Sequence, residues 1–284
     1  MSTTPSPELC AWLDWYRLMG VDEVIGAHSV DRLAPGRSYT GEAGTEAGTA
    51  RPAPPEASVP GAGSPAPRAR APGHLLQSPG SAVASAREIA AACHDLAALE
   101  AAAGAFDGCV LRETALHCCF ADGGPEAEVM LIGEAPGAEE DRLGRPFVGQ
   151  SGKLLDRMLA TIGLPRSSVY ITNVIYWRPP GNRSPTQAEI AACQPFLERQ
   201  IELLKPKIIV FLGGIAARGL LGVKEGVSKL RGRLFVHTTA DGTRIPAMIT
   251  FHPAFLLRTP AQKRLAWRDL LSLKQRLEEV KRPH

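Results

Sequence analysis

The chain has 284 residues, of which 44% are hydrophobic and 21% charged, and its formal net charge is +3. This is the composition of a globular chain with a sizeable core, and the small charge permits an anionic partner without requiring one. No apolar run is long enough to span a bilayer, and the N-terminus lacks the pattern of a secretory signal. Six cysteines in such a chain indicate reduced thiols or ligands, so we expect a cytoplasmic protein with no membrane partner.

Three zones follow one another along the chain. Residues 1–30 predict a short helical segment, and residues 31–85, rich in proline, alanine, glycine and serine, predict a disordered linker. Residues 86–284 predict the folded domain, near whose start a strong helix former covers 85–103. The N-terminal helix has two interpretations: a poorly ordered extension, or a docking motif for another protein. Its apolar residues are Leu9, Trp12, Leu13, Tyr16, Leu18 and Met19.

Extended and helical segments alternate within the third zone. Continuous apolar runs predict buried parallel strands, and they cover 128–133, 168–174, 207–213 and 245–251. Helical patterns lie between them, over 151–163, 186–204 and 214–222. The second of these opens with Thr186 and Glu189 at capping-box spacing. The alternation predicts an α/β fold, a three-layer α/β/α sandwich with a central four-stranded parallel sheet.

An unusual loop follows each predicted strand. The four loops read GEAPG, NVIYWRPPGNR, GGIAARG and HPAFLLR. Ligands of open parallel sheets bind beyond the carboxyl ends of the strands. We therefore expect the four loops to meet at one rim and to form a site there.

The first loop, Gly133–Gly137, and the segment after it combine glycines with candidate functional side chains. Glycine lets backbone approach a ligand closely. Glu134 either positions and deprotonates a water or caps the next helix, and both interpretations stay open. Phe147 either offers a ring face to a planar ligand or packs in the core. Ser151, at the start of a helix, suits a phosphate.

The later loops add polar side chains to the same rim. Asn173 ends a predicted strand and offers a donor and an acceptor together, or else makes a turn. Arg178 and Arg183 lie on a proline-stiffened loop, which suits backbone phosphates. His252 ends the last predicted strand. A lone histidine is more often structural, but its company on this rim favours a functional role.

Three ordered motifs closely resemble those of the family 4 uracil-DNA glycosylases. They are GEAPGAEED with GRPFVG.SG.LLD.ML, then ITNVI..RPPGNR.P, then HPAFLLR, and the resemblance covers roughly residues 106–270. It implies a monomeric enzyme that flips uracil out of DNA and hydrolyses its N-glycosidic bond, leaving an abasic site in base excision repair. The alternatives are a glycosylase with broadened range (hypoxanthine or xanthine) and a catalytically weak damaged-DNA binding module.

The resemblance also implies roles for particular residues. Phe147 stacks on the flipped base, Asn173 hydrogen-bonds uracil N3–H and O4, and His252 stabilises charge at O2 of the departing base. Glu134 orders the attacking water, and Asn182 is a weaker candidate for that task. The remaining uracil-binding positions are Gly133 and Ala135.

The implied partner is uracil-containing DNA, which would associate the protein with the nucleoid. Within the HPAFLLR motif, Leu256 to Arg258 would enter the minor groove as an apolar wedge. The implied DNA contacts come from Ser151, Lys153, Arg178, Pro180, Arg183, Ser184, Leu256 and Arg258.

The chain departs from the family at one place. Family 4 enzymes typically carry a [4Fe–4S] cluster on four cysteines. The corresponding positions here are Phe106, Cys109, Trp177 and Cys193. Two thiolates cannot hold a cubane cluster, so we expect that the cluster is lost and that no cofactor is needed. Cys118 and Cys119 are an alternative source of ligands, although adjacent cysteines rarely reach one cluster.

Overall fold

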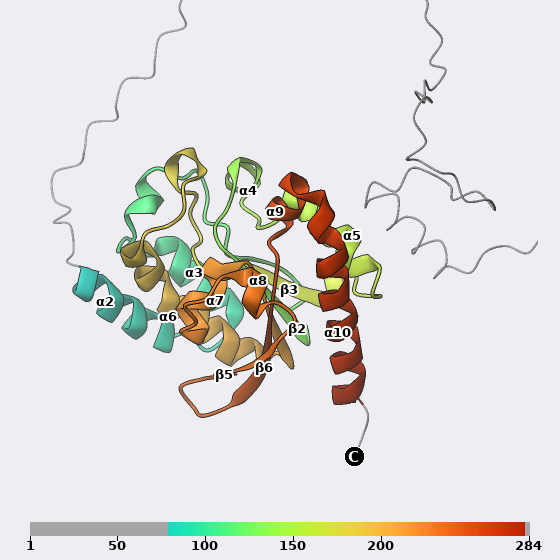
Figure 1. Cartoon of the computed structure of the whole chain (residues 1–284). Helices are drawn as coiled ribbons and strands as arrows, with labels where there is room; N and C mark the ends of the chain where they lie inside the picture. The colour runs from blue at the N-terminus through green and yellow to red at the C-terminus, as the bar shows by residue number, and fades with distance from the viewer. Residues whose placement is uncertain (1–78, 282–284) are drawn as a thin grey trace, which may run out of the picture. The chain divides into compact units, whose positions relative to one another are not determined.

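The computed structural model describes residues 79–281, which form a mixed α/β domain (Figure 1). Its single six-stranded sheet has the strand order β1-β3-β2-β4-β6-β5. The strands are β1 (Ala121–Gly123), β2 (Val129–Gly133), β3 (Val169–Asn173), β4 (Ile208–Leu212), β5 (Leu234–Thr238) and β6 (Arg244–Thr250). The inner four are parallel, which confirms the four predicted strands. The prediction of a four-stranded sheet is corrected to six, because β1 and β5 add antiparallel edges.

Helices cover both faces of the sheet, which is why every residue of β2, β3 and β4 is buried. On one face α2 (Pro79–Ala91), α3 (Leu96–Ala105), α6 (Gln187–Leu204), α7 (Gly214–Leu221) and α8 (Val227–Leu230) share a core with the sheet. On the other face lie α5 (Gln150–Ala160), α9 (Pro253–Arg258) and α10 (Lys263–Lys281). Figure 1 shows α10 and α6 on opposite sides of the strands. The three-layer architecture is therefore the predicted one.

Successive buried residues of the four inner strands alternate between these two cores. In β2, Met130 and Ile132 join the α6 side, whereas Val129 and Leu131 join the α5 and α10 side. This alternation follows from the twofold repeat of an extended chain. Both faces are apolar, so the strands read as continuous apolar runs.

Local signals explain the helix boundaries. The segment predicted as one helix former over 85–103 is two helices, because Asp95 caps α3 by accepting a hydrogen bond from Ala98 N (2.7 Å). The capping box predicted for α6 is confirmed: Thr186 N donates to Glu189 (2.7 Å) and Glu189 N to Thr186 (3.3 Å). Helix α2 starts at Pro79, seven residues before the predicted domain boundary. The short elements are α4 (Ala138–Leu143), η1 (Val110–Glu113), η2 (Arg166–Ser168), η3 (Pro180–Asn182) and η4 (Pro260–Gln262).

The predicted N-terminal helix and most of the predicted linker, residues 1–78, lie outside the described residues. Within residues 79–281, no helix has both the length and the apolarity needed to cross a bilayer.

Candidate active site

A cleft of about 460 Å³ opens at the carboxyl edge of the parallel strands. Figure 1 places α4 and α9, whose loops border it, at the same end of the sheet. Its lining residues are Glu134, Ala135, Pro136, Gly137, Glu140, Phe147, Ser151, Asn173, Pro179, Asn182, Arg183, Ser184, His252, Ala254 and Arg258. Three of the four predicted loops meet there. The fourth loop begins at Gly213 and lies next to His252, because a Cβ built on Gly213 would lie 3.4 Å from the His252 side chain.

Asn173, Phe147 and Gly133 meet at the floor of the cleft. The Asn173 side chain is 1% exposed, yet neither its Nδ2 nor its Oδ1 has a hydrogen-bond partner. A Cβ on Gly133 would lie 2.3 Å from Asn173 Oδ1 and 2.5 Å from Phe147 Cζ. Only glycine leaves room for this approach. A buried amide without partners costs about 1–3 kcal/mol, so its natural complement is a ligand that pairs with both atoms.

The loop that carries Phe147 is held in an uncommon conformation. Phe147 has φ 52°, in the left-handed region that non-glycine residues rarely enter. Arg166 fixes this backbone by donating to Phe147 O (2.9 Å) and Pro146 O (2.7 Å), while also pairing with Asp122 and Asp156. Phe147 is 5% exposed. It packs in the core and also lines the cleft, so the core-packing and ligand-facing interpretations are compatible.

His252 faces this ring from the end of β6. The centroids of the Phe147 and His252 rings lie 5.5 Å apart at 32°. His252 Nδ1 accepts a hydrogen bond from Ala254 N (3.1 Å), so the neutral ring carries its proton on Nε2. Burial, and secondarily the charge of Arg258, lowers the pKa of His252 to about 4. At neutral pH the side chain is therefore an uncharged N–H donor.

Glu134 lies on the wall of the cleft, partly exposed, directly after β2. Asn182 also lines the cleft and has φ 54°, and its Oδ1 accepts a hydrogen bond from Arg178 Nε (2.8 Å). This bond fixes the Asn182 amide so that its Nδ2 is the free end. Arg178 itself does not line the cleft.

Arg183 is not a free cation. Both of its terminal nitrogens donate to the buried Glu189 carboxylate (2.9 and 2.6 Å). This pairing lowers the pKa of Glu189 to about 2. The guanidinium therefore anchors the RPPGNR loop on α6 and keeps its outer face at the cleft, beside Ser184. Sequence reasoning assigned Arg183 to phosphates and missed this anchor.

Other predicted DNA contacts fall at different distances from the cleft. Ser151 and Arg258 line it, whereas Lys153 and Pro180 are exposed outside it. Leu256 is corrected: it is fully buried in the core beside α5, because α9 is a helix and turns that side chain inward. The neighbouring Leu257 is 43% exposed.

Two carboxylates of α4 that sequence reasoning did not single out hold loops around the cleft. Glu140 accepts backbone hydrogen bonds from Gly137, Val148 and Gly149. Asp141 accepts from Leu116 N and His117 N. The sequence contained a signal for the role of Glu140, because this residue lies three positions after Gly137, the N-cap residue of α4. That is capping-box spacing.

The corner that corresponds to the family's cluster site is filled by buried side chains. Phe106 packs edge-on against Phe196 at 5.1 Å between centroids, and Trp177 packs against Tyr176 at 6.1 Å. A hydrogen bond between the other two positions lowers the pKa of the Cys109 thiol, and it raises that of Cys193 together with burial.

The alternative ligands, Cys118 and Cys119, lie just before β1. Burial raises the pKa of both thiols to about 12, and Cys119 Sγ donates to Glu140 O (3.1 Å). No group of three or more His, Cys, Asp or Glu side chains in the described domain is placed to hold a metal ion. The residues present do not fit a [4Fe–4S] cluster.

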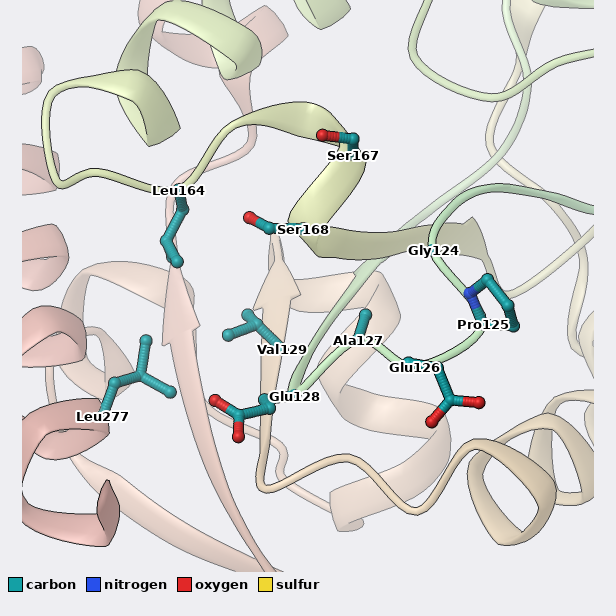
Figure 2. Close-up of a pocket in the computed structure, with 10 residues that line it drawn as sticks. All are labelled: Gly124, Pro125, Glu126, Ala127, Glu128, Val129, Leu164, Ser167, Ser168 and Leu277. Atoms are coloured by element: carbon teal, nitrogen blue, oxygen red, sulfur yellow. The ribbon is translucent and has the colours of Figure 1, made fainter. Parts of the chain in front are cut away.

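A second hollow, of about 300 Å³, lies at the opposite, amino-terminal edge of the sheet (Figure 2). Figure 2 shows Leu164 and Leu277 along one side and the carboxylates of Glu126 and Glu128 along the lower rim. Glu128 pairs with Lys207 (2.5 Å). The only charged residues that line this hollow are the two glutamates, which repel phosphates, so the carboxyl-edge cleft remains the candidate site.

The molecule is an α/β/α protein whose polar, aromatic cleft lies at the carboxyl ends of the strands, where open parallel sheets bind ligands. Comparison with known proteins identifies the group: the model of the Uracil DNA glycosylase superfamily matches residues 120–271, and the chain belongs to this superfamily.

Three relatives are named uracil-DNA glycosylases. A Type-4 uracil-DNA glycosylase from Pyrobaculum aerophilum is 40% identical, over 58% of this chain and 85% of that protein. One from Thermotoga maritima is 42% identical, over 53% of this chain and 77% of the relative. A Type-5 uracil-DNA glycosylase from Thermus thermophilus is 40% identical over a shorter stretch, 35% of this chain and 52% of its own.

Proposed function

We propose that this chain is a uracil-DNA glycosylase, a hydrolase that removes uracil from DNA and leaves an abasic site. The observation that carries the proposal is the buried Asn173 amide, whose Nδ2 and Oδ1 both lack partners beside the Phe147 ring. Uracil offers a donor at N3–H and an acceptor at O4, side by side on a planar ring. The names of the relatives support the same activity.

Recognition begins when the uracil nucleotide leaves the base stack and enters the cleft. The base stacks on Phe147, while Asn173 Oδ1 accepts from N3–H and Nδ2 donates to O4. Backbone at Gly133 and Ala135 closes the floor, because a side chain at 133 would occupy the space of Asn173 and Phe147. Binding thus satisfies two buried groups at once.

Hydrolysis then breaks the bond between uracil N1 and the sugar C1′. The electron pair of that bond goes to uracil, whose developing charge at O2 is stabilised by the Nε2–H of the neutral His252. Water adds to C1′, its hydroxyl stays on the sugar and its proton ends on the departing base. Glu134 orders this water, with Asn182 Nδ2, which also lines the cleft, as a second contact.

DNA contacts flank the cleft on both sides. Ser151, at the start of α5, and Arg258, the last residue of α9, line the cleft and would hold phosphates. Leu257 takes the role that the sequence assigned to Leu256, since it is the exposed apolar side chain of that helix and can fill the vacated stack. Lys153, Arg178, Pro180, Arg183 and Ser184 complete the proposed DNA surface.

The proposal includes an enzyme without an iron–sulfur cluster. Phe106 packs against Phe196 of α6, and Trp177, directly before the RPPGNR loop, packs against Tyr176. We propose that this packing replaces the support that a cluster would give by ligation. Action as a monomer, which the resemblance implies, is part of the same proposal. Association with the nucleoid follows from the substrate.

A single-turnover assay tests the function. Excess protein is mixed with labelled duplexes that carry one U:G pair, one U:A pair or one hypoxanthine, and abasic sites are revealed as alkali-labile breaks. We expect cleavage at uracil that is lost in His252→Ala. Cleavage at hypoxanthine alone would favour the broadened glycosylase, and binding of folded protein without cleavage would favour the damaged-DNA binding module.

A further inference from the structure

Two loops between helices and strands shape the proposed uracil pocket. The first, 133–137, supplies the floor and Glu134. The second, 145–149, supplies Phe147. Both loops donate backbone hydrogen bonds to the same buried side chain, the carboxylate of Glu140, which is 9% exposed.

The two oxygens of Glu140 divide between the loops. Oε2 accepts from Gly137 N (3.1 Å) in the first loop. Oε1 accepts from Val148 N (3.0 Å) and Gly149 N (2.9 Å) in the second. Hydrogen bonds to an ionised acceptor are the stronger kind, and three of them converge here on one side chain.

The surroundings leave little freedom for this carboxylate. A Cβ on Gly137 would lie 2.7 Å from Glu140 Oε2, and one on Gly149 would lie 3.2 Å from Oε1. Phe147, with its left-handed backbone, directly precedes the two amides that Oε1 accepts. The distance between the floor of the pocket and the Phe147 ring therefore depends on Glu140.

We propose that Glu140 is a positioning residue of the glycosylase, one whose carboxylate holds Phe147 over the site where the flipped base lies. The inference rests on the proposed function. Glu140 acts through the backbone at 137, 148 and 149, so it sets the geometry of the pocket without forming or breaking any bond.

Asp141 provides a matched control on the same helix. It is also a buried carboxylate, 4% exposed, that accepts two backbone N–H bonds, from Leu116 (2.8 Å) and His117 (3.2 Å). Those amides belong to a segment that does not line the cleft. Glu140→Ala and Asp141→Ala thus each remove a buried helix carboxylate, but only the first releases the pocket loops.

The experiment compares single-turnover rate constants, inhibition by free uracil and melting temperature in these two variants and in Glu140→Gln. We expect Glu140→Ala to lower the rate constant about tenfold or more and to weaken inhibition by uracil, because small misplacements of a stacking group are costly. Asp141→Ala should lose thermal stability while it keeps both activities. Glu140→Gln should be intermediate, since its oxygen can serve only one of the two loops.

Hydrogen exchange at Val148 and Gly149 gives a readout that does not depend on activity or on the substrate. Faster exchange there in both Glu140 variants, but not in Asp141→Ala, supports the proposal, and it does so even if Glu140→Ala is too unstable to assay. Equal loss of uracil inhibition in Asp141→Ala, or unchanged exchange in Glu140→Gln, would overturn it. A wild-type protein that releases no uracil would instead count against the proposed function alone.

Discussion

At the scale of single residues, the pocket contains a buried polar side chain that does not stabilise the fold. Asn173 is the last residue of β3, and it is buried with both polar side-chain atoms unpaired. Such an amide lowers the stability of the empty protein, because both atoms lose water and gain no partner. Its presence indicates that the gain in ligand binding outweighs this loss of stability.

The first prediction follows from this amide. Asn173→Leu, which has similar volume and no polar atoms, should raise the free energy of unfolding by about 1 kcal/mol and abolish uracil release. Denaturant unfolding and the single-turnover assay measure the two effects. A variant that loses stability and activity together would show that the amide has a structural role instead.

The second prediction concerns His252 and pH. Because its pKa is lowered to about 4, the ring stays neutral as pH falls, and the rate constant should stay level from about pH 8 to about pH 5. The same shift costs stability between about pH 6.5 and about pH 4, where the unfolded chain binds a proton that the folded chain refuses. Rate constants measured across this range, with circular dichroism to verify folding, test the point. A fall centred near pH 6.5 would contradict it.

At the scale of elements, the segments around the cleft can approach one another closely because they carry glycines. Gly133 ends β2 where Asn173 and Phe147 converge, and a Cβ on Gly152, in α5, would lie 1.8 Å from Phe147 O. The two glycines allow the helix, the strand and the ring to meet within one small volume.

The third prediction compares two glycine substitutions. Gly133→Ala should lower stability by about 1–3 kcal/mol and the rate constant by about 100-fold, because the methyl group displaces Asn173 and Phe147. Gly104→Ala, in α3 with open space around it, should instead stabilise the protein by about 0.5–1 kcal/mol and leave activity unchanged. Thermal melts and rate constants of both variants distinguish these effects.

The elements also show what sequence could predict. Buried strands and capped helices were predictable, since apolar runs and capping boxes are local signals. The edge strands were not, because β1 has only three residues and β5 exposes Leu234 and Val236. Leu257 was not singled out as the exposed leucine because the HPAFLLR motif was treated as a loop. In a helix, Leu256 and Leu257 lie on different faces. The Arg183 anchor depends on a fold-back to Glu189 that spacing alone does not reveal.

At the scale of the whole domain, two cores of side chains clamp one sheet, and the corner formed by η1, α6 and the loop after β3 belongs to the larger core. Phe106, Trp177 and the two thiols there are at most 2% exposed. Buried side chains fill this corner, which is the basis of the proposed loss of the cluster.

The fourth prediction is that the purified protein is colourless and holds no stoichiometric iron, even when it is prepared without oxygen. Metal analysis and visible absorbance test this directly. The double variant Phe106→Cys with Trp177→Cys, reconstituted with iron and sulfide, restores four cysteines and serves as the positive control. Stoichiometric iron in the wild-type protein would contradict the proposed loss of the cluster.

The aromatic rings at 106 and 177 also change what the protein requires from its cell. An enzyme that carries a cubane cluster needs iron and sulfide to complete its fold, whereas phenylalanine and tryptophan are supplied by translation alone. With the proposed loss of the cluster, uracil release by this chain should therefore not depend on the supply of iron.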